Sequence, residues 1–157
     1  MFRVEDFRPI SEADTLAPYT PCVVHRNMDV PCQFTPDYHG TERRHQLTIS
    51  TWMGRGIGWL DHEPHWESFK VIPPLYMSQW NELPHDEPEE GALLLIYLPN
   101  RCRTPFSHVQ AGLHFGSYLD GELKAYKHLP RDLHSDRRGW VTLPSRACDR
   151  FLPIKLD

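Results

Sequence analysis

The chain has 157 residues, of which 39% are hydrophobic and 24% charged, and its formal net charge is −4. This length suits one domain with one buried core, and the composition excludes an intrinsically disordered chain. The N-terminal residues lack the apolar core of a signal peptide, and no run approaches the roughly 18 apolar residues of a membrane span. We therefore expect a soluble, cytoplasmic protein without membrane contact, whose four cysteines are reduced.

The predicted elements, taken in chain order, are mostly short strands. Residues 1–21 contain Pro9, Pro18 and Pro21 and predict an irregular lead-in with one helical turn near 11–16. Helical spacing predicts short helices at 75–83 and 119–129. Apolar or alternating runs predict strands at 22–26, 46–51, 68–72, 92–98, 112–115, 139–143 and 151–156.

These elements predict an α+β fold class, a strand-rich single domain with two or three short helices. The domain is expected to span residues 22–157, after the lead-in at 1–21. Pro153 within the last strand predicts that this strand lies at a sheet edge. The glycine run at 53–58 predicts a tight turn that exposes Arg55, with a phosphate site on its backbone amides as the alternative.

The charges are unevenly distributed along the chain. Residues 1–100 hold 7 Lys and Arg against 15 Asp and Glu, whereas residues 101–157 hold 10 against 6. A basic C-terminal third indicates contact with phosphate or a nucleic acid. The alternative is that it complements the acidic part of the chain within one fold.

Four residues have side chains and a rough spacing suited to tetrahedral zinc: Cys22, His25, Cys32 and His39. They predict a zinc-stabilised binding module for a protein or nucleic-acid partner. The alternative is that the cysteines are small buried side chains. A second grouping, His62 and His65 within the sequence DHEPH, contains Pro64, which excludes a zinc-binding helix there.

Four tryptophans lie within thirty residues of one another: Trp52, Trp59, Trp66 and Trp80. Exposed aromatic side chains favour protein interfaces. The four tryptophans therefore predict a binding or inhibitor protein with no small-molecule site. The alternative is that they pack in the core.

Two segments carry a family resemblance. The first is the triplet His39-Gly40-Thr41, and the second is Gly112-Leu113-His114-Phe115-Gly116-Ser117, followed by Ala125-Tyr126. Together they resemble the His-type branch of the ADP-ribosyltransferase superfamily. The resemblance implies an enzyme that binds NAD and transfers ADP-ribose to a macromolecular target.

The resemblance also implies roles for individual residues. His39 would hydrogen-bond a ribose hydroxyl of NAD, and the backbone of Gly40, beside Thr41, would hold the nicotinamide carboxamide. His114 would stack on the nicotinamide ring, with Ser117 and Tyr126 in the same pocket. Breaking the glycosidic bond builds positive charge that a carboxylate must stabilise. The family uses a glutamate on a late strand, for which Asp149 is the candidate.

The toxin-like branch of the same superfamily offers another set of matches, which excludes the first. Its arginine, serine–threonine and Glu-x-Glu elements resemble Arg26, Ser50-Thr51 and Glu87-Pro88-Glu89. The alternative is that Glu87 and Glu89 belong to a solvated acidic turn.

Overall fold

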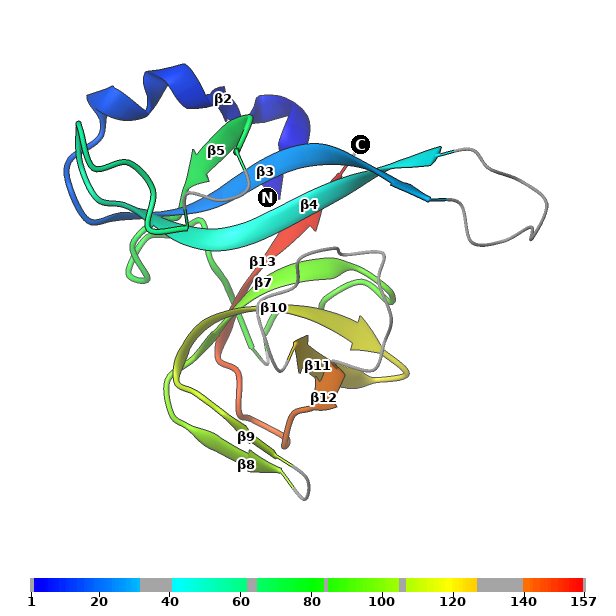
Figure 1. Ribbon diagram of the computed structural model, residues 1–157. Helices are drawn as coiled ribbons and strands as arrows, with labels where there is room; N and C mark the ends of the chain where they lie inside the picture. Colours follow the sequence, from blue (N-terminus) through cyan, green and yellow to red (C-terminus); the bar gives the residue numbers. More distant parts are fainter. Residues whose placement is uncertain are drawn as a thin grey trace. The chain divides into compact units, whose positions relative to one another are not determined.

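Strands are the main regular structure in the part of the chain that the structure describes (Figure 1). The computed structural model describes residues 2–31, 41–61, 65–83, 85–104, 107–126 and 140–156. The helical segments among them are two 3-10 turns, η1 (Val4–Asp6) and η2 (Ile10–Thr15). The predicted α+β class is therefore wrong, and the fold is mostly β.

Both predicted longer helices are replaced by other structure. Residues 75–80 form turns that lead into the short strand β6 (Asn81–Glu82), and residues 122–126 form strand β11 (Glu122–Tyr126). The predicted helical turn near 11–16 is confirmed as η2.

The chain divides into two compact units, each described here by itself. The first unit contains the described residues of 2–6, 72–126 and 140–156, and the second contains those of 7–71. The prediction of one domain at 22–157 stays a prediction.

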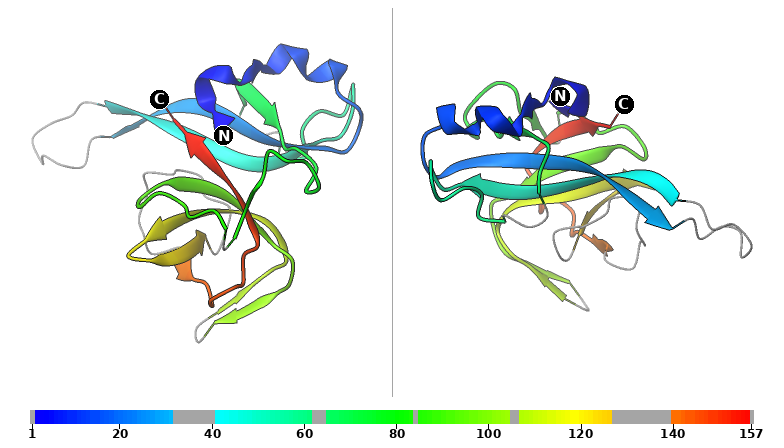
Figure 2. Two further views of the ribbon diagram at one scale, coloured as in Figure 1. Left: turned by 180° about the vertical axis from the view of Figure 1, so that it is seen from behind. Right: turned by 45° about the horizontal axis from the view of Figure 1, so that its top comes forward.

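The second unit is built on a four-stranded antiparallel sheet (Figure 2). β3 and β4 are long paired strands, each twelve residues in length, and they contain the two strands predicted at 22–26 and 46–51. The strands in spatial order are β2 (Arg8–Pro9), β5 (Ser68–Val71), β3 (Thr20–Pro31) and β4 (Thr41–Trp52).

One face of this sheet carries an aromatic core. Cys22, Val24 and Phe69 are fully buried against a cluster that includes Ala13 of η2. Trp52, Trp59 and Trp66 belong to the same cluster. The sheet and the 3-10 turn therefore share one apolar layer.

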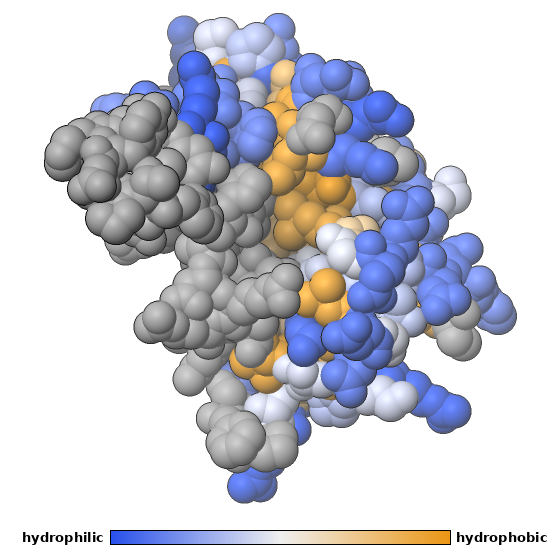
Figure 3. All heavy atoms as spheres, turned by 90° about the vertical axis from the view of Figure 1, so that its right-hand side faces the viewer, coloured by the Kyte–Doolittle hydropathy of each residue, from blue (hydrophilic) through white to orange (hydrophobic). Residues whose placement is uncertain are grey.

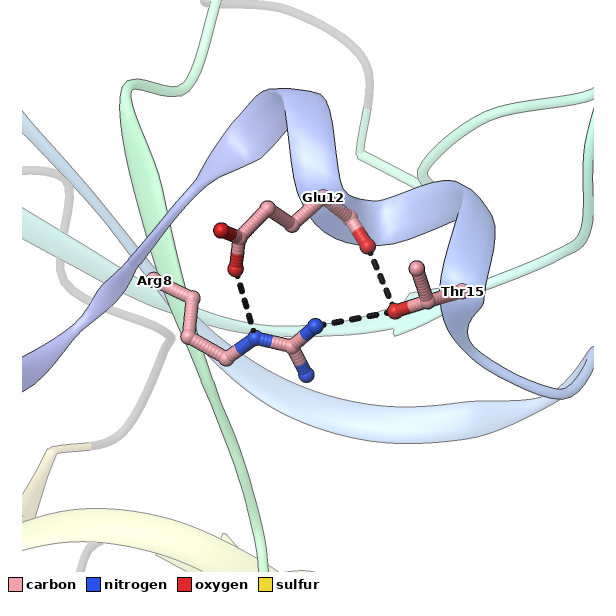
Figure 4. Close-up of polar contacts among 3 residues, drawn as sticks. All are labelled: Arg8, Glu12 and Thr15. Atoms are coloured by element: carbon pink, nitrogen blue, oxygen red, sulfur yellow. Dashed lines mark hydrogen bonds and ion pairs between the residues drawn. The ribbon is translucent and has the colours of Figure 1, made fainter.

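Side-chain hydrogen bonds between Arg8 and two residues of η2 hold this 3-10 turn beside the core (Figure 4). The Arg8 guanidinium donates to Glu12 Oε2 and to Thr15 Oγ1, both at 2.9 Å, and its Cζ lies 5.2 Å from the centre of the Phe69 ring. The guanidinium thus lies over an aromatic face while it also closes the 3-10 turn.

The first unit is built on a larger, mixed sheet. Its central strand β7 (Leu93–Leu98) is almost continuously apolar, as a strand buried on both faces requires. Two further short strands, β8 (Cys102–Thr104) and β9 (Ser107–Val109), form a separate ribbon. In spatial order the sheet runs β1 (Phe2–Arg3), β13 (Arg150–Lys155), β7, β10 (Gly112–Leu119), β11 and β12 (Trp140–Thr142), with β6 also paired to β13.

The last strand is not at the sheet edge, so the prediction from Pro153 is wrong. β13 pairs with β7 on one side, and with β6 and β1 on the other. On that second side β6 reaches Phe151 and β1 begins at Ile154, so Pro153 falls between the two short strands. A position without a ladder partner on one side can accommodate the missing N–H of proline.

A two-residue turn joins β10 to β11 in the segment predicted as a helix. Leu119 pairs with Glu122, and Asp120 and Gly121 between them have φ values of 54° and 77°. Positive φ at both positions is the geometry of a type I′ hairpin, which Asp-Gly favours. The GLHFGS segment therefore runs into a β-hairpin.

Candidate functional site

The residues predicted for NAD do not form one pocket in the described part of the chain. His39 and Gly40 lie outside the described residues, as do the side chains of Thr41 and Tyr126. His114 and Ser117 both lie on β10, three residues apart, so they point to opposite faces of the sheet. One ring of NAD cannot contact both side chains across a sheet.

His114, Ser117 and the neighbouring glycine have local roles in the sheet. His114 Nε2 lies 2.7 Å from the carbonyl oxygen of Gln110, and Ser117 is buried. A Cβ placed on Gly116 would lie 2.7 Å from the carbonyl oxygen of Lys124, so β10 and β11 approach closely only because this residue is glycine.

Asp149, the candidate for the catalytic carboxylate, precedes β13. Its backbone oxygen accepts a hydrogen bond from Leu83 N at 3.0 Å. Its Oδ1 is buried and has no hydrogen-bond partner among the described residues. A carboxylate oxygen in this state needs a donor, but nothing among the described residues places it beside His114 or Ser117.

The predicted zinc ligands are separated in the same manner. Cys22 and His25 lie three residues apart on β3 and point to opposite faces, and Cys32 and His39 lie outside the described residues. No group of three or more His, Cys, Asp and Glu side chains in the described part of the chain is arranged to hold a metal ion. Burial raises the pKa of Cys22 to about 12, although the nearby charge of Arg8 lowers it in part.

The toxin-like matches are divided between the two units. In the second unit Arg26 Nε donates to Gln46 Oε1, and Ser50 Oγ accepts from Asp61 N at 3.3 Å. Glu87 and Glu89 belong to the first unit.

A buried histidine pair links three strands of the second unit. His25 Nε2 lies 2.8 Å from His45 Nδ1 on β4, and His25 Nδ1 lies 3.4 Å from Ser68 Oγ on β5. The edge of the Phe7 ring meets the His25 imidazole, with 6.3 Å between ring centres. Only 4% of His25 is exposed.

Ser68 and His25 are placed like the nucleophile and base of a serine–histidine catalytic pair, but His25 is not basic enough to act as the base. Burial and, to a smaller extent, the charge of His45 lower the pKa of His25 to about 4, and Glu67 opposes both. A general base works best when its pKa is near the operating pH. His25 is therefore a weak base toward Ser68 at neutral pH, and the cluster acts as a hydrogen-bonded tie between strands.

The four tryptophans are buried, so they belong to the protein interior and not to an exposed interface. Other large apolar side chains are exposed instead: Tyr19, Ile57, Leu60, Tyr76 and Met77. On the face drawn in Figure 3, hydrophobic residues reach the surface among hydrophilic ones.

The first unit contains a cavity of about 620 Å³ between an acidic loop and the last strand. Its rim is the acidic loop, residues 85–91, with the carboxylates of Asp86, Glu87, Glu89 and Glu90. Its apolar side is formed by Ala92 together with Phe151, Pro153 and Ile154 of β13, and Asn81 and Lys155 complete the lining. The lining residues thus carry four carboxylates, one imidazole (His85) and one ammonium group.

Hydrogen bonds hold the acidic loop against the β10–β11 hairpin. Glu87 Oε1 accepts from the Tyr118 hydroxyl at 2.9 Å, and Glu90 Oε1 accepts from Asp120 N at 2.7 Å. Asp86 Oδ2 accepts from Glu82 N at 2.9 Å. The hydrogen bond to Glu87, and the charges of Glu87 and Glu90, raise the pKa of Tyr118. The negative charges that disfavour the phenolate form of Tyr118 also favour a bound cation nearby.

The sequence predicts for Glu87 and Glu89 either the Glu-x-Glu element of the toxin-like branch or a solvated acidic turn, and it does not connect them with the last strand. The density of carboxylates in "HDEPEEG" was the available signal. The neighbouring apolar wall is supplied by residues about sixty positions later, which no local pattern indicates.

The chain matches no protein-family model, no curated protein and no solved structure. None of the helices in the described ranges has the length and apolar character needed to cross a bilayer.

Proposed function

We propose that the chain is a binding protein that takes a cationic segment of a protein partner into the acidic cavity. The composition of the cavity carries this proposal, with four carboxylates and one ammonium group beside an apolar wall. A lysine or arginine placed there gains charge-assisted hydrogen bonds, and its aliphatic stem or an apolar neighbour packs on Phe151 and Ile154. A volume of about 620 Å³ is large enough for several side chains.

The rim favours binding because it is already ordered. Asp86, Glu87 and Glu90 each accept a hydrogen bond from within the first unit, so their positions are fixed before a ligand arrives. Fixed groups lose little conformational entropy on binding. Glu89 is exposed, and its carboxylate makes no hydrogen bond or ion pair with any described residue, which leaves it for the partner.

The test is a calorimetric titration of the full chain with two capped tripeptides, Arg-Ile-Leu and Glu-Ile-Leu. The arginine peptide is expected to bind, with an affinity that falls as salt rises, and the glutamate peptide is not. Glu89→Gln should weaken the arginine peptide about fivefold, equivalent to ~1 kcal/mol. Glu122→Gln, an exposed acid outside the cavity, is the matched control and should change nothing.

Equal binding of both peptides, or full affinity in Glu89→Gln, would contradict the proposal. NAD is titrated into the same sample and its zinc content is measured, because the ADP-ribosyltransferase and zinc-module interpretations stay predictions. Saturable NAD binding would favour the former, and stoichiometric zinc the latter.

A further inference from the structure

The second unit exposes a segment with the chemistry that the acidic cavity selects. We call residues 53–60, with the sequence MGRGIGWL, the glycine turn. Ile57 is 71% exposed and Leu60 59% exposed, and Arg55 is also exposed. Large apolar side chains exposed to this degree beside a cation are typical of a contact surface.

The glycine turn is firmly anchored. Gly58 N donates to Gly54 O at 3.0 Å, and Met53 N donates to Gly58 O at 2.9 Å, which closes the turn on itself. Gly54, Gly56 and Gly58 all have positive φ, as the sequence prediction of a tight turn requires. The backbone of the segment therefore has little conformational entropy left to lose on binding.

Buried tryptophans fix the base of the glycine turn. Trp59 bridges to Trp52 at the end of β4, and their ring centres lie 5.2 Å apart. Leu60 N then donates to Thr51 O at 2.9 Å. Both tryptophans belong to the core of the second unit, so the turn projects from a rigid support.

Arg55 has no ion pair or hydrogen bond with any described residue. The cavity presents the complementary set, in which the Glu89 carboxylate has no hydrogen bond or ion pair with any described residue and Phe151 and Ile154 form an apolar wall. The cation and the apolar side chains of the glycine turn are therefore complementary to the carboxylates and the apolar wall of the cavity.

We infer that the glycine turn of one copy of the chain docks into the acidic cavity of a second copy, with Arg55 at the carboxylate rim and Ile57 on the apolar wall. This inference rests on the proposed function of the cavity and names its occupant. Each copy carries one turn and one cavity, so association closes into a reciprocal pair or continues as an open chain of copies.

The test is sedimentation velocity of the full chain over a wide concentration range. The wild-type mass is expected to rise with concentration. Arg55→Glu and Glu89→Arg should each weaken association about tenfold or more, because each places like charges together. Arg101→Glu and Glu122→Arg, exposed residues outside both surfaces, are the charge-matched controls and should associate as the wild type does.

Mixing the Arg55→Glu and Glu89→Arg variants is the more stringent test of the pairing between turn and cavity. The intact turn of the Glu89→Arg copy then meets the intact cavity of the Arg55→Glu copy, so association should return in the mixture although neither variant associates alone. Far-ultraviolet circular dichroism checks that both variants fold as the wild type does.

A wild type that stays monomeric, association that ignores both charge reversals, or a mixture that does not recover would each overturn the inference. The peptide titration separates this failure from that of the proposed function. If the Arg-Ile-Leu peptide binds a chain that does not self-associate, only the identity of the occupant is wrong. If the peptide does not bind either, the cavity is not a cation site and both proposals fall.

Discussion

Replacing His25 by glutamine is expected to flatten the pH dependence of unfolding of the second unit. Burial lowers the folded-state pKa of His25 from 6.5 to about 4, and in the unfolded chain the imidazole returns to its ordinary value. Between these two pH values the unfolded chain binds a proton that the folded chain does not. The stabilising contribution is therefore complete above pH 6.5 and is lost as the pH falls toward 4.

The magnitude follows from the two pKa values. The full difference corresponds to about 3 kcal/mol, of which about 2 kcal/mol is already lost at about pH 5. Carboxylates also begin to titrate in this range, so the comparison with His25→Gln isolates the histidine. The variant is expected to be less stable than the wild type at neutral pH by about 1 kcal/mol, because His45 Nδ1 loses its imidazole partner, and to lose less stability on acidification.

The assay is urea unfolding followed by tryptophan fluorescence, since Trp52, Trp59 and Trp66 all lie in the core of the second unit. His65→Gln, at an exposed position in the same unit, is the control and should keep the wild-type pH dependence. An NMR titration of His25 measures its pKa directly. Parallel pH profiles for the wild type and His25→Gln, or a His25 pKa near 6.5, would refute the reasoning.

Three further predictions concern the packing of both units. Gly116→Ala should destabilise the chain by about 1–3 kcal/mol in urea unfolding, because its Cβ would lie 2.7 Å from a backbone oxygen; an unchanged midpoint would show that the strands can separate freely. Gly121→Ala should cost less, about 1 kcal/mol, because a Cβ there meets no other atom and only the positive φ of 77° disfavours alanine; the reverse order of the two costs would contradict this account. Burial raises the pKa values of Cys22 and Cys148 to about 12 and about 11, so site-resolved mass spectrometry should find neither alkylated near pH 8 until urea unfolds the chain.

The strands could be predicted from the sequence where the apolar pattern was strong. The run at 92–98 contains β7. The predicted strands at 22–26 and 46–51 lie inside β3 and β4, which extend to Pro31 and begin at Thr41. The outer half of β4 is polar and that of β3 mixes Met28 and Val30 with polar residues, so local hydrophobicity could not reveal them, and pairing between the two strands sets their length.

The helix predicted at 119–129 shows how one local signal can outweigh another. Leu119, Leu123 and Tyr126 have helical spacing, but Asp120-Gly121 between two apolar runs is a strong hairpin signal. The structure follows the turn chemistry, because two strands that pair across Asp120-Gly121 satisfy backbone hydrogen bonds and bury Ala125 fully. A glycine in a helix interior would have cost about 1 kcal/mol instead.

One geometric feature separates two pairs of the predicted site residues, while the NAD and zinc interpretations themselves stay predictions. Cys22 and His25 were assigned to one predicted strand, and His114 belonged to another that the structure extends to Ser117. Residues three apart on a strand point to opposite faces, so neither pair can meet around one ligand. The acidic cavity has the opposite property: its rim and its apolar wall are distant in sequence and adjacent only because β13 pairs with β7, which directly follows the acidic loop. The alternation of side chains along a strand could have separated Cys22 from His25 on the sequence alone, whereas the separation of His114 from Ser117 and the cavity itself depend on the observed strand bounds and sheet register.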